Sequence, residues 1–440
     1  MNEILTKALQ LILSLSILVI IHEFGHFFFA RLFKTRVEKF YLFFNPWFSI
    51  FKKKIGETEY GIGWVPLGGY VKISGMIDES MDKEQMKLPP QPYEFRSKKS
   101  SQRLLIMLGG ILFNIILAFF IYSMVLFTWG EKYLQNSEVR YGIMTDSLGK
   151  SIGIKNGDKI LSLDNKPVDN FRKITHDILL DDVKTIQLLR NDSVINISIP
   201  ESIKAELIKN PSFIEVRIPF IADEFIKNSV GEKAGIKKGD RFIALNDSSV
   251  NYFDEVKEWL SQNKNKQVKI SLLRNNDTVN VSLIVPSDGK LGIFPLADLD
   301  KFFKLKEVHY GFFASIPAGF EKTFSMLDSY IKQFKLIFSP ETKAYESIGG
   351  FITIGKIFPA EWDWLSFWSM TAFLSIILAF MNLLPIPALD GGHVLFLLYE
   401  IITRRKPSDK FLEYSQIVGM AILFALLIFA NGNDIIKLFK

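Results

Sequence analysis

Two histidines and a glutamate lie close together near the start of the chain, in the segment HEFGH at positions 22–26. Residues four apart lie on one face of an α-helix, so His22 and His26 can present two imidazole nitrogens to one metal ion. Zinc in a hydrolase also needs a further protein ligand and an open position for water, whose acidity the ion raises. The spacing therefore predicts a zinc site, with Glu23 as the base that takes a proton from that water.

A third ligand is predicted far along the chain, in the stretch NLLPIPALDGG at positions 382–392. Asp390 is the only acid between Asp363 and Glu400, so it is the natural carboxylate to complete a set of two histidines and one acid. Two prolines interrupt the helix there, which at membrane depth is tolerated only where the backbone lines a protein cavity. Because the chain contains no cysteine, thiol ligands and a thiol nucleophile are excluded.

Both motifs lie in or beside long apolar runs, which indicates a membrane protein with soluble parts. Aromatic residues make up 14% of the 440 residues, and they gather in these runs rather than being spread evenly. We expect four transmembrane helices, over residues 5–30, 104–129, 365–384 and 417–430. Asn114 is the polar exception in the second run, where it either bonds a neighbouring helix or approaches the catalytic centre.

Clusters of Lys and Arg predict the orientation of these helices. They gather in residues 31–103 and 403–412, so both loops are expected in the cytoplasm and the N-terminus outside. The net charge of +6 is modest and is concentrated in these loops, so we assign no nucleic-acid role.

Within the first basic loop, residues 59–73 mix β-branched and aromatic side chains with glycines and a proline, as bent or edge strands do. An edge strand beside a protease centre could bind an extended substrate by strand addition, because backbone hydrogen bonds do not depend on the substrate's sequence. A purely structural hairpin is the alternative.

Residues 131–296 contain an internal repeat. The segment GIKNGDKI at positions 153–160 corresponds to GIKKGDRF at 235–242, and LLRND at 188–192 corresponds to LLRNN at 272–276. Two copies of a compact, strand-rich domain follow from the repeat. Each copy resembles a PDZ domain, a module that binds peptides or chain ends at a sheet edge. The expected regions are 1–130, a first copy at 131–217, a second at 218–300, and a C-terminal membrane region at 301–440.

Taken together, HEFGH, the run PLGGYVK at 66–72 and NLLPIPALDGG resemble the site-2 protease family, in the branch with two PDZ domains. The resemblance implies a multi-span α-helical membrane protein with two inserted PDZ-like domains and a membrane-associated β-loop. By position it implies zinc (Zn2+) bound by His22, His26 and Asp390, and Glu23 as the base. It also places Asn382 beside the site, holding substrate backbone, and matches the β-loop strand to Gly61, Ile62, Gly63 and Trp64.

The resemblance further implies an intramembrane zinc metalloprotease of the bacterial cytoplasmic (inner) membrane, with its PDZ-like domains on the periplasmic side. Its expected partners are membrane lipid and single-span membrane proteins after a first cleavage: anti-sigma factors and remnant signal peptides. Peptide or substrate ends would bind the PDZ-like domains, although the first copy could equally act as a steric filter. An inactive scaffold would be expected to lack one of the four site residues, and a metallochaperone or a protease of soluble substrates would carry the motif outside the lipid span.

Overall fold

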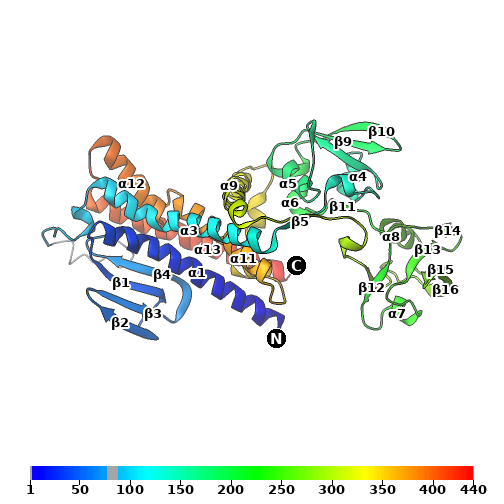
Figure 1. The fold of residues 1–440 in the computed structure, drawn as a ribbon, viewed down its shortest axis with the longest axis horizontal. Coiled ribbons are helices and arrows are strands. Elements are labelled where there is room, and N and C mark those ends of the chain that lie inside the picture. Colours follow the sequence, from blue (N-terminus) through cyan, green and yellow to red (C-terminus); the bar gives the residue numbers. More distant parts are fainter. Residues whose placement is uncertain (1, 77–87, 440) are drawn as a thin grey trace. The chain divides into compact units, whose positions relative to one another are not determined.

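The computed structural model describes residues 2–76 and 88–439 and divides the chain into two compact units (Figure 1). The first unit holds the chain up to Gly130, His309–Lys335 and the residues from Tyr345 onward. The second holds Glu131–Val308 and Leu336–Ala344.

Four long helices of the first unit are apolar and long enough to cross a membrane. They are α1 (Glu3–Leu32), α3 (Ser100–Trp129), α11 (Trp364–Leu383) and α13 (Asp409–Leu438). The predicted fold class, with about four transmembrane helices, is confirmed. The fourth helix is 30 residues long and extends well beyond the predicted 417–430, because the polar residues flanking that apolar run continue the helix.

Helix α1 buries a narrow stripe whose members are mostly four residues apart. The stripe consists of Thr6, Gln10, Ser14, Leu18, His22, Gly25, His26 and Ala30. Its polar members find partners in the bundle: Gln10 Nε2 donates to the carbonyl of Pro359 at 2.9 Å, and Thr371 Oγ1 donates to Ser14 Oγ at 3.0 Å. This stripe fixes which face of α1 points inward, and the two histidines lie on that face.

A contact between glycines brings α1 and α3 together. A Cβ atom on Gly25 would overlap the backbone of Gly109, and one on Gly109 would lie 2.7 Å from the carbonyl carbon of Gly25. Only residues without a side chain allow two helix backbones to approach so closely.

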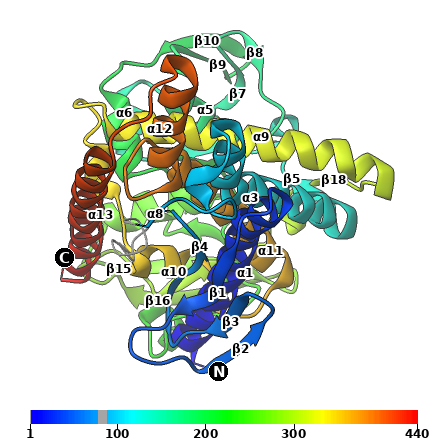
Figure 2. The same cartoon turned by 90° about the vertical axis from the view of Figure 1, so that its left-hand side faces the viewer.

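A four-stranded sheet with the order β2-β3-β1-β4 packs beside α1 in the first unit (Figure 2). Its strands are β1 (Val37–Phe44), β2 (Phe51–Ile55), β3 (Thr58–Ile62) and β4 (Val65–Ile73). Strands β1 and β3 run parallel, whereas β1 and β4 are antiparallel. Strand β4 therefore forms the edge that lies against α1, and β3 is an inner strand.

Helix α12 (Asp390–Thr403) follows α11 after a turn that contains Pro385 and Pro387. Its far end is tied to α3, because Glu400 forms an ion pair with Arg103 and accepts a hydrogen bond from Ser100 at 2.9 Å. The Arg103 and Glu400 side chains are only 9% and 15% exposed.

The described part of the first unit also contains helices α9 (Phe312–Ile337), whose last two residues are assigned to the second unit, and α10 (Phe351–Ile357). Helix α9 is amphipathic: it buries Ser315, Gly319 and Thr323 and exposes phenylalanines such as Phe313 and Phe320. Helix α10 contacts α1 and α13.

The second unit contains two sheets with the same strand order, as the repeat predicts. The first is β10-β9-β7-β8 and the second β16-β15-β13-β14, with a helix between corresponding strands in each. The first copy comprises β6 (Ile143–Thr145), α4 (Ser147–Ser151), β7 (Lys159–Leu163), β8 (Lys166–Pro167), α5 (Lys173–Leu180), β9 (Thr185–Arg190), β10 (Ser193–Ser198), α6 (Ile203–Lys209) and β11 (Ile214–Val216). The second comprises β12 (Ala222–Phe225), α7 (Val230–Lys233), β13 (Arg241–Leu245), β14 (Ser248–Ser249), α8 (Phe253–Gln262), β15 (Gln267–Arg274), β16 (Asp277–Ile284) and β17 (Ile293–Pro295).

The residues that repeat between the two copies form the same buried Arg–Asp ion pair in each copy. In the first copy Arg190 donates to both carboxylate oxygens of Asp158, at 2.7 Å each, and Asp158 also accepts from the Lys155 backbone N–H. In the second copy Arg274 binds Asp240 in the same way, at 2.7 and 2.6 Å. Such two-pronged pairs are geometrically specific, which accounts for the recurrence of Gly-Asp and Leu-Leu-Arg.

The second unit extends past the predicted end of the second copy at residue 300. Strand β18 (Lys306–Val308) pairs antiparallel with β5 (Glu131–Tyr133), and Phe302 and Phe303 are buried in the core of the first copy. The chain thus enters the second unit through β5 and leaves it through β18, the strand paired with β5.

Candidate metal and catalytic site

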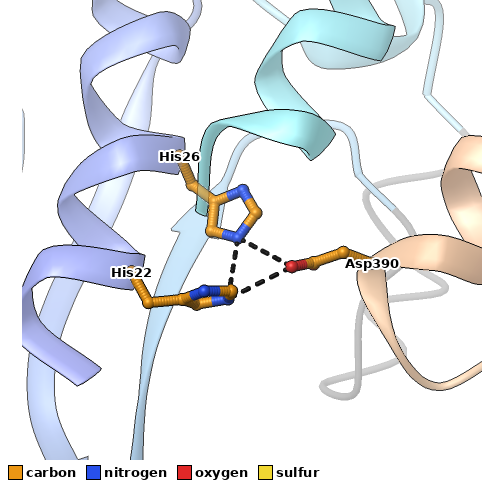
Figure 3. Close-up of side chains that lie close together, drawn as sticks. All are labelled: His22, His26 and Asp390. Carbon is orange, nitrogen blue, oxygen red and sulfur yellow. Dashed lines mark hydrogen bonds and ion pairs between the residues drawn. The ribbon is translucent and has the colours of Figure 1, made fainter. Parts of the chain in front are cut away.

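His22, His26 and Asp390 converge in the first unit, from α1 and the start of α12 (Figure 3). The Nε2 atoms of the two histidines are 3.2 Å apart. Asp390 Oδ2 lies 3.1 Å from His22 Nε2 and 3.2 Å from His26 Nε2. The three donor atoms therefore form a nearly equilateral triangle.

This triangle fits a tetrahedral zinc ion. With zinc bonds of about 2.0 Å, neighbouring ligand atoms of a tetrahedron lie about 3.3 Å apart, close to the separations observed here. Two imidazoles and one carboxylate are a donor set of catalytic zinc sites, in which water takes the fourth position. Among the residues that the structure describes, these three form the one group that could hold a metal ion.

Each imidazole is also oriented by a contact of its Nδ1 atom, on the side away from the donor triangle. The Nδ1 atom of His26 lies 2.8 Å from the Ile106 carbonyl oxygen, to which it can only donate, so Nε2 carries the lone pair that faces the site. His22 Nδ1 lies 3.2 Å from the Asn114 side-chain amide nitrogen. Asn114 is fully buried, and its Oδ1 has no hydrogen-bond partner among the described residues. Exchanging the amide O and N by a flip gives Oδ1 the His22 Nδ1–H as donor.

The sequence left two roles open for Asn114, and both apply. Asn114 lies within hydrogen-bond distance of a neighbouring helix, α1, and its partner there is His22, a candidate metal ligand. Gly110, one turn earlier on α3, was missed by sequence reasoning. A Cβ atom there would lie 2.5 Å from His22 Cε1 and 2.6 Å from His26 Nε2. The missing side chain therefore makes room for both imidazole rings.

Asp390 is the first residue of α12, whose N-cap is Leu389. The two prolines before it end α11, and the new helix then starts at the depth of the histidines. A carboxylate in the first turn also interacts favourably with the positive end of the helix dipole. The interruption that the sequence predicts thus places the third ligand.

A cavity of about 690 Å³ borders the donor triangle. Glu23, which is half-buried, lines this cavity beside His22 and His26. Asn382 lines it too, and its Nδ2 lies 3.4 Å from His22 Nε2. The structure therefore brings together the predicted ligands, the predicted base and the predicted amide.

The edge of strand β4 forms one wall of the cavity. Consecutive residues from Gly68 to Ile73 line it, whereas the face of a strand would contribute only every second residue. Gly61 and Ile62 instead belong to the inner strand β3, and Gly63 and Trp64 form the turn before β4. None of these four lines the cavity, and Trp64 Nε1 donates to the Pro46 carbonyl at 2.9 Å. Their binding of substrate stays a prediction.

Comparison with known proteins agrees with this geometry. Residues 10–426 match Peptidase family M50. The regulator of sigma E protease of Haemophilus influenzae is 27% identical over 449 residues, which cover 97% of this chain and 98% of that protein. A Vibrio cholerae protein named as a candidate zinc metalloprotease is 28% identical over 473 residues, with both chains covered completely. The chain therefore belongs to Peptidase family M50, the site-2 protease family of membrane zinc metalloproteases.

Proposed function

We propose that this enzyme cleaves single-span membrane proteins within or near the bilayer, as the second step of regulated intramembrane proteolysis. The supporting observation is that the donor triangle, Glu23 and the edge of β4 border one cavity. An extended peptide can add to β4 through backbone hydrogen bonds alone. The substrate classes are anti-sigma factors already shortened by a first protease and remnant signal peptides. The former accords with the name of the Haemophilus influenzae relative.

Different residues of the chain have different roles in the proposed reaction. A bound zinc ion would polarise the scissile carbonyl and raise the acidity of water. Glu23 takes a proton from the attacking water and gives it to the leaving amide nitrogen, as a base positioned beside its substrate does. The Asn382 amide donates a hydrogen bond to the substrate backbone and so holds the reacting carbonyl near His22.

The test is to replace Glu23 by Gln, which fills the same volume but accepts no proton. We expect Glu23→Gln to retain zinc and to lose cleavage of a single-span substrate by 10²-fold or more. His22→Ala is the comparison and should lose both. Full proteolysis by purified Glu23→Gln enzyme would refute the assignment of Glu23 as the base.

We also propose that the enzyme lies in the bacterial inner membrane with both PDZ-like domains on the periplasmic side. Because the chain has no cysteine, single cysteines at the exposed positions Ser193 and Ser97 report orientation directly. A membrane-impermeant thiol reagent added to intact cells should label a cysteine at 193 and spare one at 97. The opposite labelling pattern would show that the orientation in the membrane is the reverse of the one proposed.

The PDZ-like domains are proposed to select substrates, by binding substrate ends and by excluding untrimmed outer domains. Residues 134–305 can be replaced by a two-residue Asn-Gly turn, because Tyr133 and Lys306 are direct partners in the β5–β18 ladder. Leu336–Ala344, which also belong to the second unit, stay in the shortened enzyme. The shortened enzyme should cleave a substrate that still carries its folded outer domain, which the full chain resists. If the untrimmed substrate stays resistant while the trimmed one is cut, the filter is refuted.

A further inference from the structure

Helix α13 is exposed along most of its length, and three of its described residues are buried: Gln416, Gly419 and Asp434. Contacts account for two of them. A Cβ atom on Gly419 would lie 2.5 Å from the backbone of Pro387, so the glycine lets α13 pack against the turn before α12. Asp434 accepts a hydrogen bond at 3.0 Å from the backbone N–H of Thr353, in the first turn of α10.

Gln416 is the third buried residue, and no protein contact accounts for it. Its side chain is only 5% exposed, and its carboxamide has no hydrogen-bond partner among the residues that the structure describes. A carboxamide carries two N–H donors and an acceptor oxygen, and leaving these groups unpaired in buried surroundings is costly. Gln416 lines the cavity of the metal-binding residues, so a ligand in that cavity can supply its partner.

An extended peptide in this cavity would itself have unpaired polar groups. Strand β4 is the edge of the sheet with the order β2-β3-β1-β4, so a peptide added to it would form a fifth strand. Every second N–H and C=O of that peptide would bond β4, and the others would point away from the sheet. Unpaired backbone groups are costly at membrane depth. Binding by strand addition therefore calls for polar side chains along the outer edge of the peptide.

Gln416 has the chemistry and the location for this role. It reaches the cavity from α13, which is not part of the sheet and is drawn well apart from β4 in Figure 2. Its carboxamide can donate to a substrate C=O and accept from a substrate N–H at the same time. Asn382 is the other carboxamide among the described residues of the lining, but it lies 3.4 Å from His22 Nε2 and so belongs to the metal site.

We propose that Gln416 binds the substrate backbone, on the edge of the peptide that faces away from β4. Gly419 lies less than one helical turn further along α13 and holds this part of the helix against the turn that precedes Asp390. Gln416 is therefore fixed close to the metal-binding residues. The inference rests on the proposed function, because it assumes that a peptide adds to β4. Such a contact recognises the backbone and is independent of the substrate's side chains.

The experiment uses synthetic single-span substrates in which one amide at a time, on either side of the cleaved bond, is replaced by an ester. The ester removes one N–H and leaves the side chains unchanged. We measure kcat/KM with the zinc-loaded full-length enzyme in neutral detergent, for the wild type and for Gln416→Met. Gln416→Met should cleave the all-amide substrate about tenfold more slowly, because two hydrogen bonds are lost.

The position of the ester then identifies the partner of Gln416. At one position the ester should slow the wild type about fivefold, through loss of one hydrogen bond, and have little further effect on Gln416→Met. At positions whose N–H bonds β4 the ester should slow both enzymes equally.

Thermal unfolding and zinc content separate this role from a structural one. Gln416→Met should match the wild type in both, because the amide that it removes has no partner among the described residues. Gln10→Met is the matched comparison, since Gln10 is fully buried in α1 and its Nε2 donates to the Pro359 carbonyl at 2.9 Å. It should lower thermal stability and keep the wild-type pattern of ester effects.

Three results would overturn the proposal: undiminished cleavage by Gln416→Met, ester effects that are the same in both enzymes at every position, or a loss of thermal stability in Gln416→Met, which would indicate a structural amide. In each of these the wild-type enzyme still cuts the substrate, so the proposed function stands. Failure of the zinc-loaded wild-type enzyme to cut any all-amide substrate would refute the proposed function as well.

Discussion

Replacing Gly110 by Ala should separate metal binding from folding. The added Cβ would lie 2.5 to 2.7 Å from three ring atoms of His22 and His26, whereas ordinary contacts begin near 3.4 Å. The rings would have to move by about 0.7 to 0.9 Å. The donor triangle has sides of only 3.1 to 3.2 Å, so this displacement misplaces two of its three atoms. Perturbing the support of a metal ligand typically lowers metal affinity 10- to 100-fold.

Separating the helices to relieve this overlap would break the close contact between the Gly25 and Gly109 backbones. The cost to folding should nevertheless be small. Overpacking costs about 1–3 kcal/mol, and replacing Gly by Ala in a helix recovers up to about 1 kcal/mol. We therefore expect the Gly110→Ala enzyme to fold, to bind zinc about 10- to 100-fold more weakly and to lose activity.

The assay is zinc affinity by competition with a chelator, together with thermal unfolding in the same detergent. Gly432→Ala is the control, because a Cβ atom at Gly432 of α13 has no neighbour within 4 Å. Gly109→Ala is the contrast, since its Cβ meets the α1 backbone and should lower thermal stability first. Wild-type zinc affinity in Gly110→Ala would refute the reasoning.

Three further predictions concern the supports of the site and the second unit. Asn114→Leu removes the partner of His22 Nδ1 and should lower zinc affinity about tenfold, measured by the same competition. Arg103→Met leaves Glu400 uncompensated and should lower the free energy of unfolding by about 3 kcal/mol, and Glu400→Leu should recover most of it. Burial opposes ionisation of Asp240, but Arg274 and the Lys237 N–H lower its pKa. This contribution to stability is present above the ordinary pKa near 3.9 and is lost as pH falls below it, so acid unfolding of the second unit should begin at higher pH in Arg274→Met.

The chemical content of the site could be predicted from sequence because it depends on residue types that membrane helices otherwise avoid. His22, His26 and Asp390 stand out in apolar runs, and helical spacing relates the first two. The repeat in residues 131–296 could likewise be recognised from sequence, because similar segments recur at a constant spacing. The structure then shows that the repeated residues include the Asp158–Arg190 ion pair.

The features that sequence reasoning missed are those decided by contacts between distant segments. Gly110 reads as an ordinary small residue of an apolar helix until α1 is placed against it. The order of the strands is similar, because the composition of residues 59–73 predicts strands without telling which is the edge. Pairing with β1 makes β3 an inner strand and leaves β4 at the cavity.

These contacts also determine the side from which a substrate can reach the metal-binding residues. On one side of α1, Gly25 and Gly110 bring α3 against the histidines and leave no space for a peptide. On another, Gly69 lets β4 approach Val19 and Glu23, with its edge lining the cavity. On the proposed function, a peptide paired with β4 therefore lies beside His22, His26 and Glu23, in the cavity that Asn382 and Asp390 also line. On the proposed function an order of events follows: the transmembrane segment of a substrate would become extended before its bond reaches Glu23, because only an extended chain can pair with a strand edge.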